Sequence, residues 1–188
     1  MMVWMGQAKL FTACLLISLI GGLLCGFALC RSLKSRKCYG VVPVPVALTV
    51  IFLSVYGFSA FAFRCILLCQ LLVMAGIVDK ATLEIPDKFH FLIVLVGLIG
   101  FQPFPALCGF FFVPLPFLVA ALTTGKIGGG DVKLMAASGF ALGVSTGFRM
   151  MGYGLAVGLI WNALSHRGKQ SLPLAPSLAV GCFISLLL

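Results

Sequence analysis

Hydrophobic residues run in long, nearly continuous stretches along the whole chain, and short polar segments separate these stretches. Because apolar and polar positions do not alternate within them, the stretches predict helices rather than the strands of a transmembrane barrel. Several are shorter than the ~20 residues that a full helical span needs. Eight apolar segments are predicted, with boundaries good to about two to four residues, at 10–30, 41–62, 64–79, 88–103, 106–124, 131–147, 149–165 and 172–188.

The split between the sixth and seventh segments depends on Arg149 alone. One long tilted helix, or a re-entrant pair, is an alternative for 131–165. Glycines at 139, 143 and 147 repeat every four residues in this region. Such spacing lets helix backbones approach closely in lipid, although glycine is also simply common in membrane helices.

Composition supports a membrane protein. The chain is 62% hydrophobic and 9% charged, with a mean hydropathy of +1.20. A soluble domain of this size could not cover so much apolar surface with so few polar groups. The expected fold class is therefore all-α, a polytopic integral membrane helical bundle that forms a single transmembrane domain over 1–188. The segment at 10–30 is long for a signal peptide and is expected to be a retained helix.

The basic residues predict the orientation. With the loop 31–37 placed in the cytoplasm and the segments alternating, only Lys9, Arg64 and Arg149 fall outside. This bias follows the positive-inside rule, so both termini should face out. It also explains the net charge of +9 without nucleic acid, because the basic residues sit in short loops rather than on a hydrophilic fold. Ten basic residues are assigned to the cytoplasmic side: Arg31, Lys34, Arg36, Lys37, Lys80, Lys88, Lys126, Lys133, Arg167 and Lys169.

The chain has only four acidic residues, and they form two clusters. Asp79, Glu84 and Asp87 lie between the third and fourth segments, and Asp131 follows Gly128-Gly129-Gly130. Simple interpretations exist for each: a juxtamembrane charge for Asp79, complementing a helix dipole for Glu84 and Asp87, and an N-cap for Asp131. A cap does not require three preceding glycines, which permit unusual backbone torsions and the close approach of a second segment. The orientation above places both clusters at the cytoplasmic edge.

Two carboxylates that lie close together cannot both ionise easily, so they share a proton. The ionised one can take a proton from water while the protonated one polarises a peptide carbonyl, which is the chemistry of an aspartyl protease. This chemistry needs no metal or cofactor, and the eight cysteines show no zinc-ligand spacing. Helix dipoles suggest that Asp131, at a helix N-terminus, ionises first and that Asp79, near a helix C-terminus, holds the proton.

Three features of the sequence resemble the type 4 prepilin peptidase family of GxGD membrane aspartyl proteases. The first is Asp79 followed, after five residues, by Ile85-Pro86-Asp87. The second is the segment from Gly128-Gly129-Gly130-Asp131 to Lys133, which is similar to the GxGD motif and its following lysine. The third and weakest is Leu172-Pro173-Leu174-Ala175-Pro176, similar to the proline-rich entry into the last helix of the family.

The resemblance implies an aspartic endopeptidase in the cell membrane with its active site facing the cytoplasm. Asp79 and Asp131 would be the catalytic pair, and Gly128, Gly129, Gly130 and Lys133 would shape and support the site loop. Substrates would be prepilins and pseudopilins, cut after a glycine between a basic leader and a hydrophobic helix. Partners are thus these substrates and membrane lipids, with no nucleic acid.

The remaining acidic residues, Glu84 and Asp87, are expected to contact the leader, because a basic leader would meet a strongly basic cytoplasmic surface. Anionic lipid headgroups could offset the same repulsion. The alternative function is a transporter or channel that uses membrane-edge carboxylates, although no carboxylate lies deep within a segment. A structural subunit without catalysis is a further alternative.

The resemblance covers 64–188, the expected peptidase core, and leaves 10–62 as two additional N-terminal helices. Larger bacterial members of the family carry a cytoplasmic domain with paired C-x-x-C motifs, associated with N-methylation, between the first two helices. Here that place holds only the short loop around 31–39, and Cys30 and Cys38 cannot replace two such pairs. A peptidase without methyltransferase activity is therefore expected.

Overall fold

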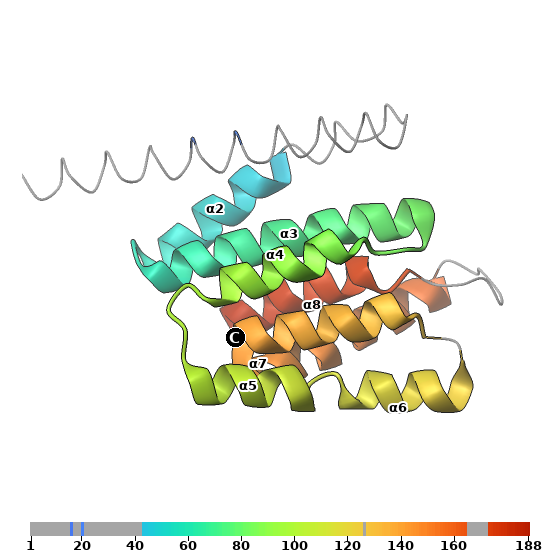
Figure 1. Ribbon diagram of the computed structural model, residues 1–188. Helices are drawn as coiled ribbons and strands as arrows, with labels where there is room; N and C mark the ends of the chain where they lie inside the picture. The colour runs from blue at the N-terminus through green and yellow to red at the C-terminus, as the bar shows by residue number, and fades with distance from the viewer. Residues whose placement is uncertain (1–15, 17–19, 21–42, 126, 165–172) are drawn as a thin grey trace, which may run out of the picture. The chain divides into compact units, whose positions relative to one another are not determined.

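The computed structural model describes residues 16, 20, 43–125, 127–164 and 173–188, and every regular element in these ranges is a helix (Figure 1). This confirms the all-α class for the described part of the chain. The predicted segment at 10–30, the loop at 31–39 and the residues 165–172 lie outside it, apart from Leu16 and Ile20. The helices are α2 (Pro43–Tyr56), α3 (Ala60–Thr82), α4 (Asp87–Gly97), α5 (Pro103–Phe112), α6 (Leu115–Thr124), α7 (Gly129–Leu164) and α8 (Ala175–Leu187).

Two helical stretches in the described ranges are long and apolar enough to cross a membrane. They are Ala60–Thr82, with 23 residues, and Pro103–Thr124, with 22 residues across α5 and α6. By length and composition they support the expectation of a membrane protein. The chain forms two compact units, Met1–Gln70 and Leu71–Leu188, which are described separately.

In the first unit, α2 ends and α3 begins earlier than the sequence suggested. Gly57 follows α2 with φ 60°, and the Ser59 hydroxyl accepts a hydrogen bond from the Ala62 N–H at 3.0 Å. A left-handed glycine ends a helix and a serine caps the next one, so the break falls at 57–59 rather than near 63. Arg64 therefore lies inside α3, with its guanidinium 5.3 Å from the centre of the Phe61 ring.

In the second unit, α7 packs against α4, α5, α6 and α8. Glycines allow several of these helices to approach closely. A Cβ on Gly139 would collide with the backbone carbonyl of Gly109 in α5, and a Cβ on Gly154 would lie 3.0 Å from the Cα of Leu178 in α8. The close packing expected of Gly139 is thus present, and a Cβ on Gly147 would similarly meet Val113.

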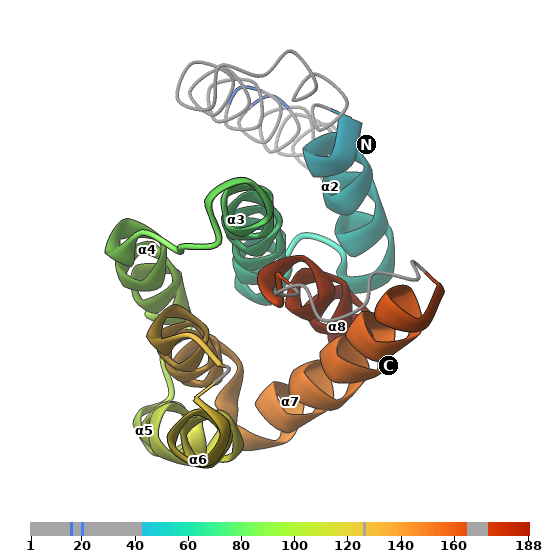
Figure 2. The same ribbon diagram turned by 90° about the vertical axis from the view of Figure 1, so that its right-hand side faces the viewer.

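Gly143, unlike Gly139 and Gly147, interrupts the helical conformation of α7. Its φ of 77° and ψ of 179° are not helical and favour glycine. Figure 2 shows that the parts of α7 before and after this point run in different directions. Residues 131–164 therefore form two helices rather than one long helix, and the break lies at Gly143 and not at Arg149.

Two other predicted boundaries were wrong. The segment 88–103 is helical only to Gly97, and Gly100 then takes φ 67° before Pro103 starts α5. The segment 106–124 is divided into α5 and α6 by a turn at Val113 and Pro114. Proline lacks an N–H and fits best at the start of a helix, which explains both positions.

Candidate active site

Asp79 lies in the last turn of α3 and is 5% exposed. Its Oδ2 accepts a hydrogen bond of 3.0 Å from the backbone N–H of Ala175, the first residue of α8. The N–H groups of a first helical turn have no partner within the helix and attract an anion. Asp79 therefore faces a helix N-terminus as well as the C-terminal end of its own helix.

Because Gly76 in α3 has no side chain, the start of α8 can lie close to α3. A Cβ on Gly76 would lie 2.9 Å from the Cα of Pro176 and 3.3 Å from the carbonyl carbon of Ala175. Pro176 fits the first turn of α8, where an N–H would have no helical partner. The proline-rich entry, the weakest of the three sequence features, thus provides the hydrogen-bond donor for Asp79.

Asp131 lies in the first turn of α7 and is only partly exposed. Burial and then the nearby negative charge of Asp79 raise the pKa of the Asp131 carboxyl to about 6, although the backbone of Gly128 acts in the opposite direction. Its Oδ1 is buried and has no hydrogen-bond partner among the described residues. The two aspartates, 52 positions apart in the sequence, are therefore close enough for one charge to affect the other.

Burial and neighbouring groups act against the proton assignment inferred from helix dipoles. Asp131 does lie at a helix N-terminus, but burial, the charge of Asp79 and its own unpaired oxygen all favour its protonated form. Asp79 is buried as well, which also disfavours its anion, but it accepts a hydrogen bond from the Ala175 N–H, which acts in the opposite direction. The structure thus favours Asp131 as the holder of a shared proton.

The three glycines before Asp131 do not use unusual torsions. The positive φ values among the described residues belong to Gly57, Leu83, Gly100, Gly125 and Gly143, so Gly128, Gly129 and Gly130 do not adopt the left-handed region. A Cβ on Gly130 would lie 3.6 Å from the Cβ of Ile85, an ordinary contact. Gly130 therefore touches the Ile85-Pro86-Asp87 motif, and the two acidic motifs meet through this contact.

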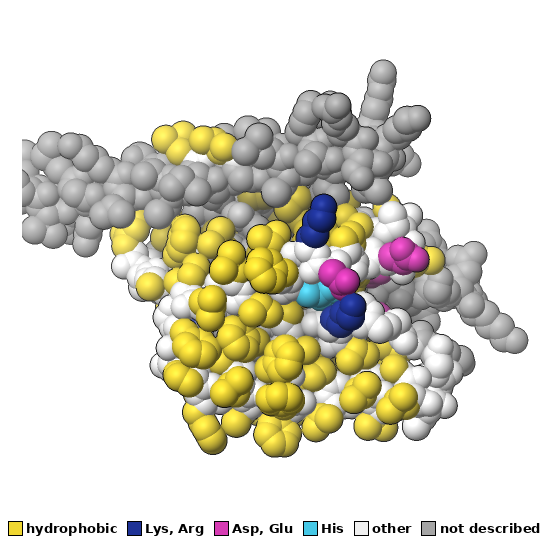
Figure 3. Space-filling model, viewed as in Figure 1, with side chains coloured by type: hydrophobic (Ala, Val, Ile, Leu, Met, Phe, Trp, Pro, Cys, Tyr) yellow, Lys and Arg dark blue, Asp and Glu magenta, His cyan; other side chains and the backbone are white. Residues whose placement is uncertain are grey.

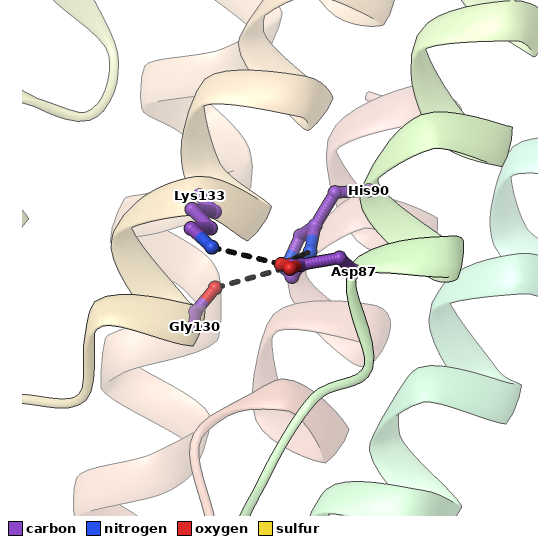
Figure 4. Close-up of polar contacts among 4 residues, drawn as sticks. All are labelled: Asp87, His90, Gly130 and Lys133. Carbon is purple, nitrogen blue, oxygen red and sulfur yellow. Dashed lines mark hydrogen bonds and ion pairs between the residues drawn. The ribbon is translucent and has the colours of Figure 1, made fainter.

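A second set of contacts joins the motifs in the same region (Figure 4). Lys133 Nζ donates to Asp87 Oδ1 at 2.8 Å, and the hydrogen bond and charge of Lys133 hold the pKa of the Asp87 carboxyl below its usual range. His90 Nε2 lies 3.0 Å from the Gly130 carbonyl oxygen, and His90 Nδ1 lies 3.5 Å from Asp87 Oδ1. Lys133 thus forms an exposed ion pair with Asp87 that joins the two acidic motifs.

The loop between α3 and α4 leaves Glu84 exposed. The Thr82 hydroxyl donates to the Glu84 carbonyl at 2.9 Å, and Leu83 takes φ 56°, as glycine commonly does at the end of a helix. In Figure 3, most acidic and basic side chains that are visible in the second unit gather near the ends of the helices, while hydrophobic side chains cover the rest of that face. Polar groups and both acidic motifs therefore share one end of this unit.

No group of three or more His, Cys, Asp or Glu side chains in the described ranges could hold a metal ion. The polar groups that surround the two aspartates are instead the backbone N–H of Ala175 and the backbone of Gly128.

Comparison with known proteins identifies the family. Residues 65–163, just over half of the chain, match the type IV leader peptidase family. The chain belongs to the type IV leader peptidase family. It is also 30% identical over 152 residues to the prepilin leader peptidase/N-methyltransferase of Bacillus subtilis (strain 168).

That alignment covers 70% of this chain and 58% of the Bacillus protein. No solved structure matched the chain. The family region contains Asp79, Asp131 and the contacts of Figure 4, whereas Ala175 lies beyond it.

Two polar contacts of this leader peptidase family member were missed from sequence. His90 was not identified as a site residue from the sequence, although its position three residues after Asp87 places both on one face of a helix and could have indicated a shared contact. Ala175 contributes only a backbone N–H, so no residue type could reveal it. Only the proline next to it indicated that a helix starts there.

Proposed function

We propose that this protein is a membrane aspartyl endopeptidase that removes the basic leader peptide from prepilin-like and pseudopilin-like substrates. The observation that carries the proposal is the meeting of the two acidic motifs of a leader peptidase family member. The charge of Asp79 acts on Asp131, and both carboxyls are shielded from water to different degrees. A water-activating base and a carbonyl-polarising acid need such a pair.

In the proposed mechanism, Asp131 carries the shared proton and donates it to the carbonyl oxygen of the scissile peptide. Asp79, whose Oδ2 accepts the Ala175 N–H, takes a proton from the attacking water. Asp79 then gives this proton to the amine nitrogen as the peptide C–N bond breaks, and Asp131 regains its proton from the remaining hydroxyl as the new carboxyl group forms. The unpartnered Oδ1 of Asp131 is the atom available for a bond to substrate. No metal or cofactor takes part in these steps.

We propose further that residues 64–188 form the peptidase core of one multi-pass domain with eight apolar segments, two of them N-terminal to the core. The site faces the cytoplasm at the inner or plasma membrane, and both termini face out. The charge distribution supports this topology. The short loop at 31–39 supports a peptidase without methyltransferase activity, which incubation of a cleaved substrate with S-adenosylmethionine and mass spectrometry of its new N-terminus would test.

The central test is cleavage of a prepilin-like substrate by the purified protein in detergent or lipid. Asp79→Asn and Asp131→Asn should each reduce kcat by at least ~10²-fold, because positioned acid–base catalysis contributes about 10²–10⁴-fold. Phe104→Ala, which changes an exposed side chain on α5, is the control and should retain activity. The melting temperatures of both amide variants are compared with that of the wild type to confirm that the variants are folded.

Cleavage that survives either amide change would reject the catalytic pair. A folded wild type that cuts no leader-bearing substrate, but carries a cation-dependent or proton-dependent flux in vesicles, would favour the transporter or channel instead.

The same assay tests whether Glu84 and Asp87 contact the leader. We propose that they do, although Asp87 is already paired with Lys133. Glu84→Gln should therefore raise KM more for a leader with many basic residues than for one with few. An equal change for both leaders would exclude a charge-reading role for Glu84.

A further inference from the structure

We propose that His90 is a positioning residue that fixes the peptide unit immediately before Asp131 and thereby orients the Asp131 side chain. The inference rests on the proposed function and extends it to a residue outside the two acidic motifs. It begins from the hydrogen bond between His90 on α4 and the Gly130 carbonyl at the start of α7, drawn in Figure 4.

The donor in this bond is settled by chemistry. A carbonyl oxygen can only accept, so Nε2 of His90 must carry a proton and donate it across the 3.0 Å contact. Both the neutral Nε2–H tautomer and the imidazolium satisfy this requirement. The contact is therefore kept whether the ring is neutral or charged.

The bond acts on the peptide plane that carries Asp131. The carbonyl of Gly130 and the N–H of Asp131 belong to one planar unit. His90 holds its oxygen, and the Asp131 N–H donates to the Gly128 carbonyl at 3.1 Å. With both ends of the plane held, the position of the Asp131 Cα is constrained, although the preceding residues are three flexible glycines.

A parallel contact crosses the same pair of helices. Asp87 and His90 are three residues apart on α4, and Gly130 and Lys133 are three residues apart on α7. Three-residue spacing places each pair on one helix face, so Asp87–Lys133 and His90–Gly130 lie side by side. Nδ1 of His90 also lies 3.5 Å from Asp87 Oδ1, which Lys133 already occupies.

The two contacts differ in what they contribute. The side chains of Asp87 and Lys133 are 78% and 61% exposed, and exposed ion pairs contribute little. His90 is buried, and a buried hydrogen-bonding group is costly to leave without its partner. Of these two contacts between α4 and α7, the hydrogen bond from His90 to Gly130 therefore restricts the start of α7 more strongly.

The test compares two substitutions that separate hydrogen bonding from packing. His90→Gln can keep an N–H near the Nε2 position, whereas His90→Leu fills the space without a donor. His90→Leu should lower kcat by about 10- to 100-fold, because small misplacements of a reacting group can cost about 10²-fold. Its KM should stay within about twofold, and His90→Gln should recover most of the lost kcat.

The control variant is Ile93→Val, which alters a fully buried side chain on the same helix. It should lower the melting temperature while its kcat stays within about twofold of wild type. A His90→Leu variant that loses only thermal stability would overturn the proposal. So would a His90→Gln variant as impaired as His90→Leu in a folded protein.

A second readout does not depend on proteolysis. Amide exchange at Asp131, compared with amides in α8, should be about three- to tenfold faster in His90→Leu than in wild type. Unchanged relative exchange would overturn the positioning role. If wild type cuts no leader substrate while this exchange effect appears, the proposed function fails and the positioning of the turn by His90 stands.

Discussion

At the scale of single residues, the two aspartates have different environments. Both are partly or fully buried, but Asp79 has the Ala175 N–H as a donor, whereas Asp131 Oδ1 has no hydrogen-bond partner in the described part of the chain. A carboxyl in that second environment is more stable when protonated. The dipole argument from sequence considered only the helix to which each aspartate belongs, and it left out both burial and the contact with α8.

The raised pKa of Asp131 predicts how stability depends on pH. The folded protein holds this proton more tightly than the unfolded chain, since the pKa rises from 3.8 to about 6. The contribution is therefore fully present below about pH 4 and is lost as the pH rises through about 6. Asp131→Asn removes this dependence, so its melting temperature relative to wild type should increase between pH 5 and pH 8.

Thermal unfolding of purified protein across this pH range measures the difference. Glu84→Gln, which changes an exposed side chain in the neighbouring loop, is the matched control and should show a smaller change with pH. A melting-temperature difference for Asp131→Asn that is constant, or that shrinks with rising pH, would contradict the burial argument.

At the scale of elements, glycine positions decide how α7 serves the site. Gly139 brings the first part of α7 against α5, and Gly143 turns the chain so that the second part packs with α8. One part of α7 thus presents Asp131, while the other contacts the helix whose N-terminus binds Asp79. The regular four-residue spacing of these glycines suggested one packing face. In the structure, Gly139 and Gly147 allow close packing, whereas Gly143 interrupts the helix.

Two alanine substitutions in α7 should have opposite effects. Gly139→Ala places a methyl group against the Gly109 carbonyl and should destabilise the protein by about 1–3 kcal/mol. Gly152→Ala meets nothing within 4 Å and should be stabilising by up to about 1 kcal/mol, since alanine is the better helix former. Denaturation in detergent measures both, and a Gly139→Ala protein as stable as Gly152→Ala would contradict the close packing.

At the scale of the whole molecule, exposed hydrophobic side chains and carboxylates occupy different parts of the protein. Exposed phenylalanines such as Phe104, Phe111 and Phe112 cover α5 and suit a lipid environment. The carboxylates are absent from such surfaces and occur where α3, α4 and α7 end or begin. In this arrangement, the proposed protease site at a membrane edge would meet both a charged leader and water.

The proposed topology predicts which loops can be labelled from outside. In a background without native cysteines, Cys at position 84 should react with a membrane-impermeant maleimide only after cells are opened. Cys at position 102, between α4 and α5, should react in intact cells. The reverse pattern would invert the proposed orientation, and labelling of both positions in intact cells would reject a span between them.

The sequence by itself determined the helical class, the family resemblance and the identity of the two candidate aspartates. Long apolar runs leave a chain little choice but helices, and four acidic residues leave few candidates. Helix ends were predicted less well, because Gly57, Gly143 and Pro114 act through local torsions and hydrogen bonds that hydrophobicity does not register.

Only the tertiary structure decided how the site is supported. The donor to Asp79 is a backbone N–H from a helix 96 residues away, and the Gly130 carbonyl is bound by a histidine 40 residues away. Backbone donors and acceptors are the same in every residue except proline, which lacks the donor, so sequence cannot show which of them meet. Folding brings them together, and with them the difference in environment that divides the two aspartates into a proposed base and a proposed acid.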